Sequence, residues 1–221
     1  MFTFTIMVYD FSNINSIFST FLGELRDVDI QKDSMRFRRN LERISEILAY
    51  ELSKKLQFET KEIRTPLGVA PTAVLKEQPV LATILRAGLG MHMGLLNYFD
   101  KAESAFVSAY RKHSSEEKFE VHVEYMAAPK IDNKVLIIND PMLATGSSMY
   151  LVYKALLRQG RPSKVIIVAA IASPESLEYL KKHLPDTTEY YIGAIDQELT
   201  AQSYIVPGLG DAGDLAYGIK C

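Results

Sequence analysis

The residues with the clearest capacity for chemistry lie between Asp140 and Ser148, where an apolar segment gives way to a helical pattern. Residues 135–138 form an apolar run rich in β-branched side chains, which predicts a buried strand, and apolar residues recur at helical spacing from about residue 148. A loop between a strand and a helix start presents several backbone N–H groups in one direction, which favours phosphate. Gly146 lets a ligand approach the backbone, and Thr145 adds a hydroxyl. Because a carboxylate at the strand end suits sugar hydroxyls, the pattern indicates a sugar phosphate; an ordinary turn with a serine helix cap is the alternative.

A second candidate anion site follows residues 80–85, another apolar run that predicts a buried strand. Arg86 stands between this strand and the closely spaced Gly88 and Gly90. A basic side chain beside a small-residue helix start favours binding of a phosphate group. The alternative is a surface arginine that follows a strand. We expect both loops at the carboxyl ends of strands, where open α/β sheets bind their ligands.

These segments resemble those of a known enzyme family. Residues 140–148 read Asp-Pro-Met-Leu-Ala-Thr-Gly-Ser-Ser and are similar to the loop with which phosphoribosyltransferases bind phosphoribosyl diphosphate (PRPP). The Pro-Met-Leu-Ala part resembles the uracil phosphoribosyltransferases in particular. Residues 85–90 and 204–214 resemble the same family, in the same order along the chain. The resemblance extends from about residue 33 to the end of the chain.

The resemblance implies which residues bind PRPP. Asp140 would hold the ribose hydroxyls, and Arg86 would bind the pyrophosphate group. Arg111 matches an arginine that reaches PRPP from a long hairpin, although the family usually has an acid just after it, where this chain has Lys112 and His113. The implied PRPP-binding set is Arg86, Arg111, Asp140, Pro141, Met142, Leu143, Ala144, Thr145, Gly146, Ser147, Ser148 and Asp211.

The resemblance also implies how the base is read, because in the family the segment matching residues 199–221 forms a hood over it. Backbone groups at Ile205, Gly210, Asp211 and Ala212 would contact uracil. Uracil offers an acceptor, a donor and an acceptor along one edge, which a fixed backbone can match with N–H, C=O and N–H. Cytosine has a donor in place of one acceptor, so a buried N–H would stay unpaired, which discriminates more strongly than shape.

The implied reaction transfers the phosphoribosyl group from PRPP to uracil, giving UMP and pyrophosphate, with Asp140, Arg86 and Asp211 as catalytic residues. The implied cofactor is Mg²⁺, bound mostly through PRPP oxygens and Asp211, because Mg²⁺ needs few protein ligands. The chain departs from the common pattern at Asn139, where related transferases often have a second acid, and at Leu215, where the family commonly has a basic residue. No residue stands out as the general base for uracil N1.

The composition indicates the class of protein, its partners and its location. The chain of 221 residues is 48% hydrophobic and 24% charged, as is typical of a globular protein. Its net charge of −2 gives no general attraction to nucleic acid or an anionic membrane, and no apolar run approaches a membrane span. The only cysteine, Cys221, is terminal, so we expect a reducing, cytoplasmic location. The resemblance implies a homodimer or higher homo-oligomer, and GTP or UTP is a candidate effector.

Strands and helices alternate along the chain and must position these groups. Apolar positions at helical spacing predict a long helix over residues 33–56 and a shorter one over 174–184. The order predicts an α/β fold: a parallel sheet with helices on both faces, a β-hairpin arm and the C-terminal hood, in a single domain of residues 1–221 in which the role of residues 1–32 is undefined. Strands are expected over residues 59–64, 80–85, 102–110, 120–125, 135–138, 164–171 and 189–192, the pair between 102 and 125 resembling the hairpin arm of the family.

Three features have more than one interpretation. An apolar patch around residues 17–22 suggests packing on the body of the protein or on a neighbouring subunit. Arginines at positions 36, 38, 39 and 43 indicate either a solvated helix face or an anion or subunit contact. The glycine-rich end of the chain is either a flexible terminus or the hood.

Other functions stay open at this point. The same fold could act on orotate, xanthine or hypoxanthine, although the Tyr-Ile-Val-Pro-Gly-Leu-Gly-Asp sequence from residue 204 resembles uracil enzymes. A phosphoribosyltransferase-like RNA-binding regulator would need a basic face. A third alternative is a nucleotide sensor that keeps the PRPP loop without turnover.

Overall fold

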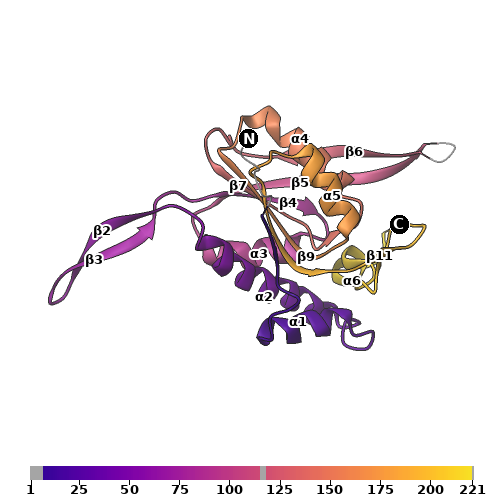
Figure 1. Cartoon of the computed structure of the whole chain (residues 1–221), viewed down its shortest axis with the longest axis horizontal. Helices are drawn as coiled ribbons and strands as arrows, with labels where there is room; N and C mark the ends of the chain where they lie inside the picture. Colours follow the sequence, from indigo (N-terminus) through magenta and orange to yellow (C-terminus); the bar gives the residue numbers. More distant parts are fainter. Residues whose placement is uncertain (1–6, 115–117, 221) are drawn as a thin grey trace, which may run out of the picture.

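Apolar strands form a sheet through the middle of the molecule (Figure 1). The computed structural model describes residues 7–114 and 118–220, and the side chains of residues 7–108 and 124–220. Within this part the central sheet has eight strands in the order β1-β10-β9-β7-β4-β5-β6, with β8 paired to β9. Their bounds are β1 (Met7–Asp10), β4 (Val80–Leu85), β5 (Glu103–Ser114), β6 (Lys118–Ala127), β7 (Val135–Asn139), β8 (Met142–Leu143), β9 (Lys164–Ala172) and β10 (Glu189–Ile195).

The strand directions confirm the predicted fold class. Neighbouring strands of the sheet pair in parallel except β5 and β6, which form an antiparallel hairpin. The strands predicted between residues 80 and 192 are all present, most of them a few residues longer than expected. The parallel strands place their carboxyl ends, and the loops that follow them, at one edge of the sheet.

Helices cover both faces of the sheet, as predicted (Figure 1). They are α1 (Ile17–Arg26), α2 (Ser34–Ser53), α3 (Leu89–Tyr98), α4 (Ser147–Leu156), α5 (Pro174–His183) and α6 (Ala212–Tyr217), with a short 3₁₀ helix, η1 (Leu157–Gln159), after α4. Ile137 of β7 packs in a first hydrophobic core, with α1, α2, α3 and α6, whereas Leu136 and Ile138 pack in a second core, with α4 and α5. Both faces of β7 are therefore buried, which explains its continuous apolar sequence.

The long predicted helix is α2, which ends at Ser53, earlier than residue 56. It begins after Asp33, whose side chain accepts the backbone N–H groups of Met35 and Arg36 at 3.0 and 3.1 Å. This satisfies two N–H groups that the first helical turn leaves without a partner.

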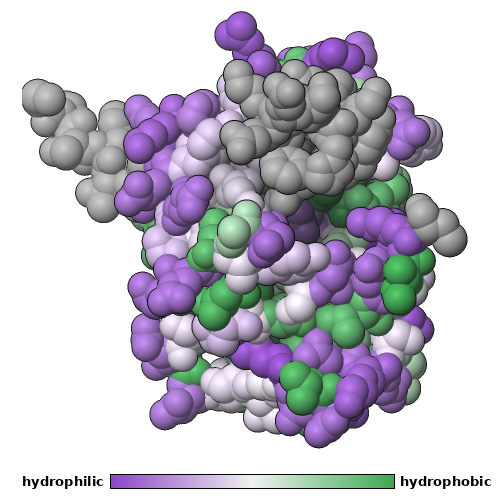
Figure 2. Space-filling model, turned by 90° about the vertical axis from the view of Figure 1, so that its right-hand side faces the viewer, coloured by the Kyte–Doolittle hydropathy of each residue, from purple (hydrophilic) through white to green (hydrophobic). Residues whose placement is uncertain are grey.

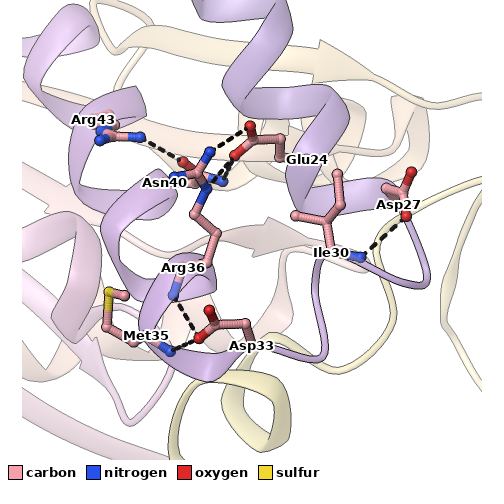
Figure 3. A network of polar contacts seen from close by, with 8 residues as sticks. All are labelled: Glu24, Asp27, Ile30, Asp33, Met35, Arg36, Asn40 and Arg43. Carbon is pink, nitrogen blue, oxygen red and sulfur yellow. Dashed lines mark hydrogen bonds and ion pairs between the residues drawn. The ribbon is translucent and has the colours of Figure 1, made fainter.

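The arginines near the start of α2 make contacts within the chain, some of which Figure 3 shows. Arg36 donates to the Glu24 carboxylate of α1 through Nε at 2.7 Å and Nη2 at 2.8 Å, and Asn40 donates to it at 2.7 Å. The hydrogen bonds from Arg36 and then Asn40 hold the pKa of Glu24 below its usual value. Arg43 lies over the ring of Phe21, with 5.0 Å between the guanidinium carbon and the ring centroid. These contacts attach α1 to α2.

The N-terminal segment packs on the body of the same chain. Strand β1 extends the sheet in parallel beside β10, and Tyr9 stacks on Tyr191 with 4.6 Å between ring centroids. Helix α1 buries Phe18, Leu22 and Leu25 against the first core. The apolar patch of the sequence is therefore largely a core-facing helix.

A second hairpin extends away from the body, at the left of Figure 1. It consists of β2 (Phe58–Thr65) and β3 (Gly68–Leu75), which pair only with each other in the described part of the chain. The sequence predicted the first strand and the turn but not β3, because Pro71 and small residues interrupt its strand pattern. Its exposed apolar side chains include Phe58, Ile63, Leu67 and Val69.

One buried histidine should affect stability. His92 of α3 is 1% exposed, its Nε2 lies 3.0 Å from the Ser104 hydroxyl, and Nδ1 has no hydrogen-bond partner among the described residues. Burial lowers the pKa of His92 from 6.5 to about 4. The unfolded chain therefore binds a proton more readily than the folded chain, so stability falls as the pH falls between these values.

We expect His92 to contribute about 3 kcal/mol to the loss of unfolding free energy between pH 6.5 and about 4, at 1.4 kcal/mol per pKa unit. Urea unfolding across this range should show a shallower loss for His92→Gln than for the unmodified chain. The control is His183→Gln, because His183 is exposed. Equal pH slopes for His92→Gln and the unmodified chain would show that His92 makes no such contribution.

Candidate active site

A cavity of about 450 Å³ lies at the carboxyl ends of β4 and β7. It is bounded by the loop after β7, the loop after β4 and the C-terminal segment, which come together from distant parts of the chain. Figure 2 looks onto the side of the molecule that carries this C-terminal segment. Where the surface there is coloured, hydrophobic residues are scattered among hydrophilic ones.

The loop over residues 140–148 is held by strand pairing and by the start of α5. Met142 and Leu143 form β8, which pairs with the end of β9. The Ser173 hydroxyl caps α5 by accepting the N–H of Ser176 at 3.0 Å and donates to the carbonyl of Ala144 at 2.5 Å. Gly146, with a φ of 76°, directly precedes α4. The loop thus runs from a strand end to a helix start, as the sequence predicted, and its backbone is fixed.

Arg86 follows β4 and contacts the C-terminal segment. The peptide bond between Leu85 and Arg86 is cis. Arg86 Nη2 donates to Asp214 Oδ1 at 3.1 Å and to the carbonyl of Gly218 at 3.0 Å. The two charged side chains are 38% and 32% exposed, and an ion pair of this exposure contributes roughly 0–1 kcal/mol. Arg86 Nε is buried without a hydrogen-bond partner in the described part of the chain. The guanidinium thus has donor capacity left for an anion in the cavity.

A buried polar pair connects the two strands that carry these loops. Asn139, the last residue of β7, places Oδ1 3.1 Å from the Thr83 hydroxyl and donates through Nδ2 to the carbonyl of Ala82 at 3.0 Å. Asn139 and Thr83 are fully buried. Because Asn139 precedes Asp140, this link fixes the start of one loop relative to the strand that leads to the other.

The hood, residues 199–220 of the described chain, is ordered rather than a flexible terminus. Strands β11 (Glu198–Leu199) and β12 (Ile205–Val206) form a short antiparallel pair, and the Val206–Pro207 peptide bond is cis. Asp211 caps α6 by accepting the N–H of Asp214 at 3.0 Å. Arg38 of α2 donates to the carbonyl of Ala216 at 2.7 Å, near the other end of α6.

Most of the predicted site residues meet at the cavity. Asp140 and Asp211 bring carboxylates to it, and Arg86 brings a positive charge. The predicted residues that line it are Arg86, Asp140, Met142, Leu143, Ala144, Thr145, Gly146, Ser148, Ile205 and Asp211. Four lie in the same loops but are not among its lining residues: Pro141, Ser147, Gly210 and Ala212. Arg111 lies in β5 opposite Val121, and its side chain falls outside the described part.

Several residues that line the cavity were not predicted from the sequence. They include Gln202, Ser203, Tyr204 and Lys220. Lys220 adds a second positive charge, near the end of the chain, where no local pattern distinguishes it from a surface lysine. Leu215, at the position where the family commonly has a basic residue, instead packs against the first hydrophobic core.

The donor set of the cavity fits Mg²⁺ only in part. Asp140 and Asp211 offer carboxylate oxygens, the ligand type that Mg²⁺ prefers, and few are needed when a phosphate ligand supplies the others. Among the described residues, His, Cys, Asp and Glu side chains form no group of three or more that could hold a metal ion.

None of the helices in the described part of the chain has the length and apolar composition to cross a membrane.

Comparisons with known proteins match nearly the whole chain. The family model described as uracil phosphoribosyltransferase matches residues 15–219. A uracil phosphoribosyltransferase of Porphyromonas gingivalis is 55% identical over 93% of this chain and 95% of its own length. One of Methanococcus vannielii is 36% identical over 96% of this chain and 90% of its own length.

Solved structures agree with these matches. The AQ2163 protein of Aquifex aeolicus superposes with a TM-score of 0.85 at 32% identity, covering 96% of this chain and 99% of that one. A hypoxanthine phosphoribosyltransferase of Staphylococcus aureus, at 17% identity and a TM-score of 0.50 over 85% of this chain and 84% of that one, shares the fold. With the two loops and the hood around one cavity, and these matches over nearly its full length, the chain belongs to the uracil phosphoribosyltransferase family.

Proposed function

We propose that the chain transfers the phosphoribosyl group of PRPP to uracil, giving UMP and pyrophosphate, with the residues around the cavity in the roles given below. The observation that carries the proposal is the convergence on one cavity of the 140–148 loop, Arg86 and the hood residues Ile205 and Asp211. The anion-binding loops face the hood across this cavity, so a sugar phosphate and a base fit together between them.

The PRPP half of the site uses the loops after β7 and β4. Backbone N–H groups and hydroxyls of residues 144–148 bind the phosphate of the sugar, and the α4 N-terminus favours its negative charge. Asp140 accepts hydrogen bonds from the ribose hydroxyls. Arg86 binds the pyrophosphate group, and the weakness of its exposed pair with Asp214 lets the guanidinium turn toward an anion. Arg111 adds a further contact from the β5–β6 hairpin.

The uracil half of the site uses the hood backbone. Ile205 and residues 210–212 present N–H, C=O and N–H groups to the edge of the base. Ile205 is 7% exposed and belongs to the first hydrophobic core, which keeps this backbone in place. Polar groups matched to uracil in a buried site reject a base whose donors and acceptors are exchanged.

The reaction breaks the bond between ribose C1 and the pyrophosphate oxygen and forms a bond from C1 to uracil N1. Pyrophosphate leaves with the bonding electrons, and the N1 proton passes to water or to the Asp211 carboxylate. Asp211 would hold Mg²⁺ together with PRPP oxygens, and the metal would supply Lewis-acid stabilisation of the leaving group. Arg86 stabilises the same negative charge, and the Asp140 carboxylate stabilises the positive charge that develops at C1. Holding N1 and C1 in line supplies much of the rate.

We also propose that the chain forms a homodimer or a larger homo-oligomer. The β2–β3 hairpin supports this, because an isolated two-stranded hairpin is only marginally stable in water. Leu67 at its tip is fully exposed and Val69 is 61% exposed.

The single terminal cysteine agrees with a reducing, cytoplasmic location. Regulation by GTP or UTP stays a prediction.

The base specificity gives the direct test of this function. With PRPP and Mg²⁺, uracil should release pyrophosphate, whereas cytosine and hypoxanthine should not. The physical reason is the fixed donor and acceptor order of the hood backbone. Pyrophosphate release is measured with each base in parallel. Comparable turnover of cytosine or hypoxanthine would refute the assigned base site, and PRPP binding without turnover of any base would favour a nucleotide sensor.

Arg86→Ala should raise the KM for PRPP strongly, because it removes a charged partner of the pyrophosphate. The same change breaks the contact to the hood, so Asp214→Asn serves as the control. That variant keeps an oxygen that can accept from Arg86 and removes only the charge of the hood residue. Steady-state kinetics with varied PRPP should show a large effect for Arg86→Ala and a small one for Asp214→Asn. Equal effects would assign Arg86 to the hood and not to PRPP.

Asp140→Asn keeps the size of the side chain and removes its charge. If the carboxylate stabilises the positive charge at C1, kcat should fall more than PRPP binding does, because that charge exists mainly in the transition state. Losing such a contact costs about 2–4 kcal/mol, or on the order of 10²–10³ in rate. The measurement is kcat at saturating uracil, with direct PRPP binding in parallel. A wild-type kcat would show that Asp140 has no catalytic charge effect.

A further inference from the structure

A salt bridge between helix α1 and Asp196, the residue after β10, contacts the middle of the hood. Arg26, the last residue of α1, forms two parallel bonds with Asp196, at 2.7 Å from Nη1 to Oδ2 and 2.8 Å from Nη2 to Oδ1. Both side chains also bind the backbone of Gly208. Arg26 Nη1 donates to the carbonyl of Gly208 at 3.0 Å, and the backbone N–H of Gly208 donates to Asp196 Oδ2 at 3.0 Å.

This arrangement fixes one residue of the hood through both of its backbone polar groups. Asp196 is 7% exposed, and Gly208 is also buried. Gly208 has a φ of 62°, and a Cβ added there would lie 2.0 Å from the carbonyl oxygen of Ile205. The backbone is therefore held at this position by charge-assisted bonds, in a conformation that other residues rarely adopt.

The fixed residue lies between the two parts of the backbone proposed to read the base. Ile205 lies before Gly208, in β12. Residues 210–212 lie after Gly208 and lead into the start of α6. The chain just after α1 also reaches this segment. Gln31 donates to the carbonyl of Arg26 at 3.3 Å, and its Oε1 would be 3.8 Å from a Cβ added at Gly210.

We infer that Arg26 and Asp196 are positioning residues for uracil recognition, which gives the N-terminal segment a role in specificity. The inference rests on the proposed reading of uracil by the hood backbone. They act through Gly208, because neither side chain lines the cavity. Hydrogen bonds weaken steeply when their geometry is lost, so a shift of this backbone should weaken uracil binding and its discrimination from cytosine. The loops after β4 and β7, which bind most of PRPP, belong to other strands and should keep their geometry.

The test compares Arg26→Lys with Arg36→Lys. Lysine keeps the charge in both cases but cannot reproduce the paired geometry of a guanidinium. Arg36 is the matched control, because its bidentate pair with Glu24 also joins α1 to another part of the chain and does not touch the hood. Asp196→Asn is the second variant, which retains an oxygen for the Gly208 N–H and removes the charge.

Arg26→Lys should raise the KM for uracil about tenfold, as expected for weakened hydrogen bonds to a charged group, and should change the KM for PRPP less than about twofold. The ratio of the inhibition constant of cytosine to the KM for uracil should fall. Arg36→Lys should leave both KM values unchanged, and Asp196→Asn should follow Arg26→Lys. Amide hydrogen exchange at Gly208 should be faster in Arg26→Lys and Asp196→Asn, and unchanged in Arg36→Lys.

Equal changes in both KM values, or unchanged values in folded Arg26→Lys and Asp196→Asn, would overturn this inference while the proposed function stands. The same experiment contains a separate check of the base site. Gly210→Ala, at a φ of 88°, should raise the KM for uracil whether or not Arg26 has this role. An unmodified chain that does not turn over uracil would overturn the proposed function and this inference together.

Discussion

The parallel pairing of β4 with β7 is the constraint on which the rest of the site depends. Its register places Val80 opposite Leu136 and Thr83 opposite Asn139, so the two strands end close together at one edge of the sheet. The buried hydrogen bond between Thr83 and Asn139 would cost free energy if the register slipped and left either polar group unpaired. Two loops proposed to bind the phosphate and pyrophosphate groups of PRPP are thereby fixed side by side.

The hood depends on arginines that come from other parts of the fold. Arg26 of α1, Arg38 of α2 and Arg86 after β4 each donate to a backbone carbonyl of this glycine-rich segment. A segment of this composition has much conformational entropy to lose on ordering. Charged donors offset part of that cost, because hydrogen bonds to charged groups are stronger than those between neutral groups. Arginines from the first half of the chain therefore hold the surface proposed to read the base, which lies near its other end.

The β2–β3 hairpin differs from the rest of the chain in how few of its apolar side chains are buried. Elsewhere, most apolar side chains of strands and helices are buried in, or packed against, one of two cores. Along this hairpin, apolar side chains such as Phe58 and Ile63 are exposed, so the burial that stabilises the body is lacking there. Within one chain, the backbone pairing of β2 with β3 is what holds the hairpin together.

The sequence by itself determined the fold class, most of the strand and helix segments from residue 33 onward, and the loops after β4 and β7. These depend on local periodicity and on short motifs, in which neighbouring residues carry the signal. The tertiary structure alone decided the role of the arginines, the ordering of the hood and the presence of Lys220 at the cavity. Asp196 is 170 residues from Arg26 in the chain, and Arg38 is 178 residues from Ala216. Partners this distant have no local pattern, because only the packing of α1, α2 and the hood around the sheet brings them within hydrogen-bonding distance.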